Sequence, residues 1–192
     1  MVSICVERRR WDRRAGFPME RWTIGDSRTW ICSLAHGRTL EVGVGTGLNL
    51  PLYDGEVELT GVDVNPVMLA MARRRAAELH LSVDLREGDA HVLPFPDASF
   101  ETVVCSLAVC SVADRGAVIA EMYRVLRPAG LLLLLDHVER RWIRGRPADL
   151  AARAGFVSER RERLRLGLIE RLAARKPGDR SGASSGPMRR ST

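Results

Sequence analysis

From Thr39 onward, apolar runs of strand length alternate with segments of helical periodicity, and this alternation limits the folds that the chain can adopt. The strand-length runs read "TLEVGVG", "VELTGVDV", "SVDLREGD", "FETVVCSLAV" and "LLLLLDHV". Such alternation predicts parallel strand pairing, right-handed crossovers and helices on both faces of one sheet. Two further runs, "FVSERRERL" and "LIERLAARK", are expected to be closing strands. The sequence therefore predicts an α/β fold, a doubly wound and mostly parallel seven-stranded sheet whose last strand is antiparallel.

Local signals place the helices of this pattern. Asn65 can cap a helix whose first turn contains Pro66, and Asp114 can cap the helix before the run of leucines. The segment "RPAG" ends that helix, and we expect Ala129 to sit in a type I turn there.

Three segments follow from these patterns. Residues 1–38 lack strand signals and are expected to form a helical segment. Residues 39–177 hold the alternating pattern and are expected to form one domain. Residues 178–192 are rich in Gly, Ser and Pro without an apolar face, which predicts a disordered tail.

Composition narrows the class of protein. The chain has 192 residues, 45% of them hydrophobic and 28% charged, as in an ordinary globular domain. No apolar run reaches the roughly 18 residues of a membrane helix, although contact with a membrane surface stays open. The four cysteines show no metal-ligand spacing, so we predict buried thiols in a cytoplasmic protein and no metal site. The net charge of +6 comes from scattered basic residues, almost all arginine, with no aromatic-rich binding motif beside them, a pattern that does not favour nucleic-acid binding.

The stretch "TLEVGVGTGLNL" is the main candidate for a ligand-binding loop. It lacks the lysine of a phosphate-binding Walker loop, and its glycine spacing does not fit the dinucleotide fingerprint. Glu41, at the end of the first strand, would repel a pyrophosphate and attract a positively charged group. S-adenosylmethionine carries a sulfonium and an ammonium beside an adenosine, so it fits this charge. Asp63, at the end of the second strand, can accept hydrogen bonds from ribose hydroxyls.

The third strand adds a further acid at its carboxyl end. Asp89 could accept a hydrogen bond from an adenine amino group, while the Ala90 N–H could meet a ring nitrogen. A short-chain dehydrogenase, the main rival among α/β enzymes, needs a Tyr-x-x-x-Lys pair that the tyrosines and the single lysine of this chain cannot form.

The ordered motifs of residues 17–177 resemble those of class I S-adenosylmethionine-dependent methyltransferases. The matching stretches are "LEVGVGTGLNLPLY", "GVDVNPVMLAMARRRA", "EGDAHVLPFPDASFETVVCSLAVCSV" and "EMYRVLRPAGLLLLLDHV". They are most similar to the methyltransferase type 11 branch that holds ubiquinone/menaquinone-biosynthesis enzymes and phospholipid N-methyltransferases. The resemblance implies a Rossmann-like fold, an N-terminal lid within residues 1–38 and a small-molecule or lipid-like acceptor.

The resemblance also assigns cofactor contacts. Val64 and Met68 would flank the adenine, and Ser106 would lie near the sulfonium. The remaining residues implied to bind the methionine, ribose and adenine parts of the cofactor are Glu41, Gly43, Gly45, Gly47, Asp63, Asp89 and Ala90.

Methyl transfer needs alignment of the acceptor with the methyl group, and a general base helps some acceptors. His137, at the end of the leucine-rich strand, is the candidate base, although a structural strand-end histidine is the competing interpretation. The segment after His137 is short, and its arginines could form a basic rim around the acceptor. The shortened segment leaves a non-catalytic or impaired S-adenosylmethionine-binding protein as the alternative function. The sequence does not indicate an oligomeric state.

Overall fold

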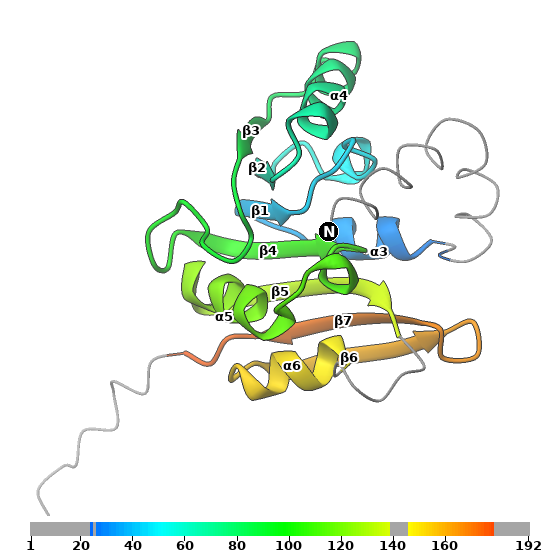
Figure 1. Ribbon diagram of the computed structural model, residues 1–192, viewed down its shortest axis with the longest axis vertical. Helices are drawn as coiled ribbons and strands as arrows, with labels where there is room; N and C mark the ends of the chain where they lie inside the picture. The colour runs from blue at the N-terminus through cyan, green and yellow to red at the C-terminus, as the bar shows by residue number, and fades with distance from the viewer. Residues whose placement is uncertain (1–23, 25, 139–145, 179–192) are drawn as a thin grey trace, which may run out of the picture.

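Seven strands form a single sheet in the order β3-β2-β1-β4-β5-β7-β6 (Figure 1). The computed structural model describes residues 24, 26–138 and 146–178. The strands are β1 (Arg38–Val42), β2 (Glu58–Asp63), β3 (Asp84–Glu87), β4 (Phe100–Ser106), β5 (Leu126–His137), β6 (Val157–Leu164) and β7 (Ile169–Arg175). The helices are α3 (Ser27–Ser33), α4 (Pro66–Glu78), α5 (Arg115–Val125) and α6 (Pro147–Arg153), with short 3-10 helices η1 (Leu50–Leu52) and η2 (Val109–Ser111).

The strand directions confirm the expected mixed sheet. β1 pairs in parallel with both β2 and β4, β2 with β3, and β4 with β5. β7 is antiparallel to both of its neighbours, β5 and β6. The chain order reverses between β1 and β4, so the switch point of the sheet lies beyond the carboxyl end of β1.

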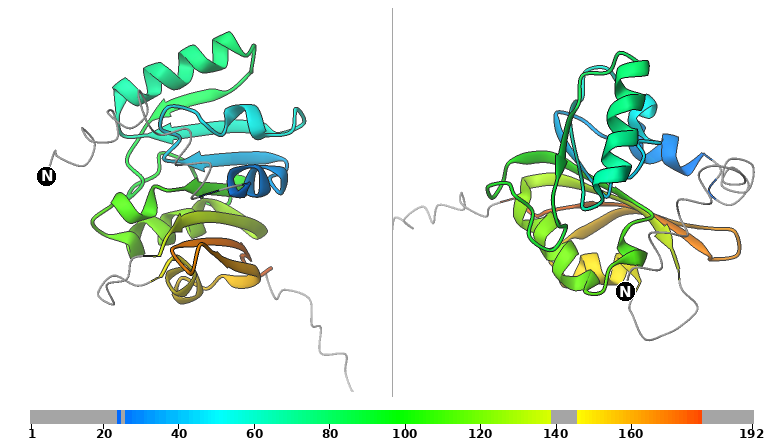
Figure 2. Two further views of the ribbon diagram at one scale, coloured as in Figure 1. Left: turned by 90° about the vertical axis from the view of Figure 1, so that its right-hand side faces the viewer. Right: turned by 45° about the horizontal axis from the view of Figure 1, so that its top comes forward.

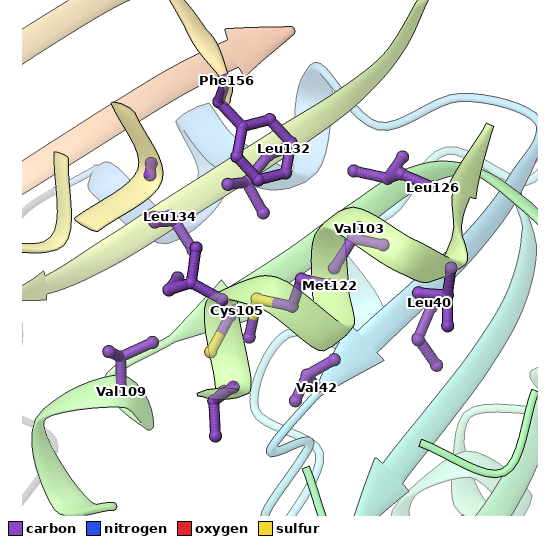
Figure 3. Packing of buried hydrophobic residues seen from close by; sticks show 14 of the residues in the cluster. Leu40, Val42, Val103, Cys105, Val109, Met122, Leu126, Leu132, Leu134 and Phe156 are labelled. Atoms are coloured by element: carbon purple, nitrogen blue, oxygen red, sulfur yellow. The ribbon is translucent and has the colours of Figure 1, made fainter. Parts of the chain in front are cut away.

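The leucine run of β5 explains how the two faces of the sheet are filled. Leu132 and Leu134 belong to the apolar cluster under α5 and α6 (Figure 3), whereas the alternate leucines belong to the cluster under α3. This alternation follows from the two-residue period of a strand, and it buries the run on both sides. Figure 2 (left) shows α3 and α5 on opposite sides of the sheet.

The expected helix caps are present. The Asn65 side chain accepts hydrogen bonds from the backbone N–H groups of Val67 and Met68, and Pro66 occupies the first turn of α4. Asp114 accepts from the N–H of Ala117 at the start of α5. These caps satisfy backbone donors that a helix N-terminus otherwise leaves without partners.

The prediction of a type I turn at Ala129 is wrong. Ala129 has φ of +60°, in the left-handed region, and the surrounding "RPAG" segment belongs to β5. A type I turn requires negative φ at both central residues. The chain must instead bend sharply between α5 and the leucine run, and an alanine takes a conformation that glycine adopts at less cost.

The structure describes the three expected segments only in part. Residues 1–23 of the predicted lid segment and residues 179–192 of the predicted tail lie outside the described residues, and α3 occupies part of residues 26–38. The boundaries of the three segments stay predictions. Among the helices that the structure describes, none has the length and apolar character needed to cross a bilayer.

Candidate functional site

The carboxyl ends of the parallel strands meet at one edge of the sheet, on the right-hand side of Figure 1. The glycine loop leaves β1 at this edge, beside the switch point. Ligands of doubly wound folds bind in the crevice at such a position.

The glycine loop has a backbone that suits its composition. Gly43, Gly45 and Gly47 all have positive φ, between +57° and +77°. A Cβ atom on Gly43 would lie 2.5 Å from the Cβ of Ala108, so a side chain there would force the loop away from the end of β4. Glycine is therefore required at Gly43 for both conformation and space.

Asp63 fixes the shape of this loop. One oxygen of its carboxylate accepts a hydrogen bond from the Gly45 N–H at 2.9 Å, and the other accepts from the Asn65 N–H at 2.9 Å. Each oxygen keeps a second lone pair. The residue predicted to bind ribose thus also joins the ends of β1 and β2 through the loop.

A buried polar network lies under the loop and contains Glu41. The Glu41 carboxylate accepts hydrogen bonds from Asn49 Nδ2 at 2.7 Å and from the Tyr53 hydroxyl at 3.0 Å. Asn49 Nδ2 also donates to Ser106 Oγ at 2.8 Å, so the fold brings Glu41 and Ser106 to one place. Burial raises the pKa of Glu41 to about 7, because removal from water penalises the charged form.

Arg28 enters the same network from α3, and the sequence patterns did not reveal it. Its Nη1 donates to Asn49 Oδ1 at 2.8 Å and to Ser106 Oγ at 3.2 Å. The arginine lies 78 positions before Ser106, in a helix that precedes the first strand. No motif spacing links the two, because only the packing of α3 against the sheet makes them neighbours.

The residues predicted to contact adenine lie at the ends of β2 and β3. Val64 is 63% exposed and Met68 is buried in the first turns of α4. Asp89 accepts hydrogen bonds from the backbone N–H of His91 at 2.9 Å and from its ring Nδ1 at 2.7 Å. The backbone hydrogen bond is the main cause that lowers the pKa of Asp89, so this carboxylate is ionised near neutral pH. Ala90 packs against the apolar cluster under α5.

The end of β5 presents His137, whose side chain is 49% exposed, beside the buried carboxylate of Asp136. Cys110, on η2, donates its backbone N–H to Asp136 Oδ2 at 2.8 Å. The sequence spacing predicted no metal site, yet within the described residues the fold gathers three potential ligands here, Cys110, Asp136 and His137. The predicted basic rim consists of Arg140, Arg141, Arg144 and Arg146. The first three lie outside the described part of the chain, and only Arg146 is described.

Comparison with known proteins agrees with this geometry. Residues 40–134 match the family model described as a methyltransferase domain. A phosphatidylethanolamine N-methyltransferase of Cereibacter sphaeroides is 46% identical over 106 residues, which cover 54% of this chain and 52% of the relative. A demethylmenaquinone methyltransferase of Deinococcus radiodurans is 44% identical over 109 residues, covering 54% and 45%. A thiol S-methyltransferase of Mus musculus is 38% identical over 103 residues, covering 52% and 42%.

The chain spans about half the length of these relatives, so their activities are not transferred to it directly. Among solved structures, an S-adenosylmethionine-dependent methyltransferase from Aquifex aeolicus has a TM-score of 0.66 at 20% identity, covering 82% of this chain and 93% of that one. The [4+2]-cyclase SpnF has a TM-score of 0.70 at 23% identity, covering 78% of each chain. At these identities the likeness shows the fold alone.

The matched family model, the named relatives and the Rossmann-like sheet together agree with the resemblance found in the sequence. Residues 40–134 are a methyltransferase domain, and S-adenosylmethionine is the cofactor that this domain indicates.

Proposed function

We propose that this protein transfers the methyl group of S-adenosylmethionine to a small-molecule or lipid-like acceptor. The observation that carries the proposal is the arrangement of opposite charges around Asn49. Glu41 lies on one side of this amide and Arg28 on the other. The methionine end of the cofactor carries an ammonium, a sulfonium and a carboxylate, so an acid and a guanidinium held close together suit it.

The donor set of the site fits this cofactor. The glycine loop, Glu41 and Ser106 would hold the methionine part, and Arg28 would meet its carboxylate. The second lone pairs of Asp63 would accept the ribose hydroxyls without loss of the contacts to the loop. S-adenosylmethionine supplies an activated methyl group, and the protein aligns the acceptor with it.

Fewer side-chain contacts support the proposed binding site for the adenine part of the cofactor than support the site for its methionine part. Val64 offers an apolar surface that is 63% exposed and would be covered by a planar base, while Met68 would lie on the other side. Asp89 and Ala90 would read the edge of the ring. Because Asp89 is already engaged by His91, binding of adenine would share or displace that contact.

His137 is proposed to accept a proton from the acceptor. Its ring is half exposed at the end of β5, where an acceptor could reach it, and Nδ1 lies 4.0 Å from Asp136 Oδ1. The bound cofactor would supply the methyl group to a lone pair of the acceptor and would leave as S-adenosylhomocysteine, while His137 would take up the proton that the acceptor loses.

The relatives are named for three kinds of acceptor, namely phosphatidylethanolamine, demethylmenaquinone and a thiol. A non-methylating protein with the same fold is the second candidate. A [4+2]-cyclase has the same fold and is named for a different chemistry. A cytoplasmic location is part of the proposal, since Cys32 and Cys105 are buried thiols.

The test is incubation of the purified chain with methyl-labelled S-adenosylmethionine and one acceptor of each of the three kinds, followed by mass spectrometry. Label in one acceptor, together with S-adenosylhomocysteine, is the expected result. Asp63→Ala should slow the transfer, since loss of the ribose acceptor and of the loop contact should weaken cofactor binding by about 1–3 kcal/mol. Cofactor binding without any labelled product would favour the non-methylating alternative, and no cofactor binding would contradict both.

A further inference from the structure

Three side chains of different chemistry converge at the carboxyl end of β5. Cys110, Asp136 and His137 each offer one ligand atom, and these atoms all lie within 4.8 Å of one another. We propose that this cluster, the thiol–carboxylate–imidazole cluster, binds a single zinc ion or a similar soft divalent cation on the acceptor side of the site.

The separations are close to those of ligands around one zinc ion. Cys110 Sγ lies 4.0 Å from His137 Nδ1, and His137 Nδ1 lies 4.0 Å from Asp136 Oδ1. Ligands of a tetrahedral zinc ion, with bond lengths of about 2.0–2.3 Å, stand roughly 3–4 Å apart. The ring of His137 can close the remaining gap by a small rotation, because about half of the side chain is exposed to solvent.

The loop that carries Cys110 is fixed in place before any ligand arrives. Leu107 leaves β4 with φ of +56°, and its N–H donates to the Leu135 carbonyl at 2.7 Å. A buried arginine, Arg115, donates Nη2 to the Cys110 carbonyl at 2.9 Å. Val109 anchors η2 in the apolar cluster (Figure 3). The left-handed conformation is unfavourable for a leucine, and such strain recurs where a side chain must be held at a functional position.

Asp136 supplies the charge that a cation needs. Its side chain is buried, with Oδ2 held by the Cys110 N–H at 2.8 Å and Oδ1 held by the His137 N–H at 2.7 Å. Each carboxylate oxygen keeps a second lone pair for a metal.

The donor set favours zinc over a hard cation. A thiolate and an imidazole are ligands of zinc, copper and similar ions, whereas magnesium and calcium bind through oxygen. Three protein ligands leave the fourth position of a tetrahedral site for water or for a donor atom of the acceptor. This last point rests on the proposed function, and it changes the role of His137, which becomes a ligand through Nδ1 when the metal is bound.

The test is a titration with Co²⁺, a coloured substitute for zinc, of the full chain after dialysis against a chelator. Neither cofactor nor acceptor is present. We expect saturation at one ion per chain, absorption typical of a tetrahedral ion and a sulfur-to-cobalt charge-transfer band, with displacement by zinc. Cys110→Ser should remove the charge-transfer band. His137→Ala should weaken binding at least ~100-fold, because changes at residues that merely orient metal ligands already cost 10–100-fold.

His36→Gln is the matched control, since His36 is an exposed histidine outside the cluster and should bind Co²⁺ as the parent chain does. Circular dichroism shows whether each variant is folded, and Asp136→Asn provides a second test at the buried ligand. Binding that is equal in the parent and in the folded Cys110 and His137 variants would contradict the site, as would no binding by the folded parent. Because the titration needs no methyl transfer, its failure is distinct from failure of the proposed function. If both hold, a chelator should lower turnover and leave cofactor affinity unchanged.

Discussion

At the scale of single residues, Glu41 should make cofactor binding depend on pH. Its pKa of about 7 in the protein means that the side chain is largely neutral below neutral pH. A bound sulfonium and ammonium favour the carboxylate, so binding releases a proton when the pH lies below that pKa. We expect the affinity for S-adenosylmethionine to fall by about tenfold for each pH unit below 7, measured by calorimetry between pH 5 and 8.

The same group affects stability in the opposite direction. The unfolded chain ionises Glu41 near 4.5, whereas the folded protein favours the neutral form up to about 7. Glu41 therefore lowers the free energy of unfolding as the pH rises from about 4.5 to about 7, by up to ~3 kcal/mol. Glu41→Gln should remove both effects. A variant that keeps the full pH dependence of binding would assign it to another group.

At the scale of elements, the bend that joins α5 to the leucine run of β5 carries a testable strain. Ala129 has φ of +60°, and glycine adopts this conformation without the clash of a Cβ atom. Ala129→Gly should raise the free energy of unfolding by about 0.5–1 kcal/mol, measured by urea denaturation, after allowance for the extra freedom of glycine in the unfolded chain. Ala120→Gly, at an exposed position of α5, is the control and should lower it by about 1 kcal/mol. Equal losses in both variants would mean that the bend is not strained.

At the scale of the whole molecule, the cofactor site should be coupled to the stability of the entire sheet. The site draws on α3, the loop after β1 and the ends of β2 and β4, which all belong to one sheet or pack on it. S-adenosylhomocysteine at 100 times its dissociation constant should stabilise the fold by about 2.7 kcal/mol. For a chain of this size the melting temperature should rise by roughly 5–10 °C in a calorimetric scan. NAD(H) should leave it unchanged, and a shift with NAD(H) alone would overturn the cofactor assignment.

Local patterns in the sequence were enough to predict the helices and strands and the edge of the sheet that holds the candidate cofactor site. The alternation of strand and helix patterns predicted the parallel strands, the resemblance to methyltransferases implied the antiparallel β7, and Asn65 and Asp114 marked the helix starts. These properties are local, because periodicity and capping depend on residues a few positions apart. The acids at the ends of β1, β2 and β3 were visible for the same reason, since each one follows its own strand.

The contacts between side chains from distant parts of the chain depend on the folded structure. Arg28 reaches Ser106 across 78 positions, and Cys110 lies against Asp136 and His137 from 26 and 27 positions away. Neither set of contacts can be recognised from the spacing of residues in the sequence. Each depends on how a helix packs on the sheet or on how a loop leaves a strand. The left-handed φ of Ala129 could not be predicted from the sequence either, because alanine does not favour this conformation. The connection between α5 and β5 imposes it.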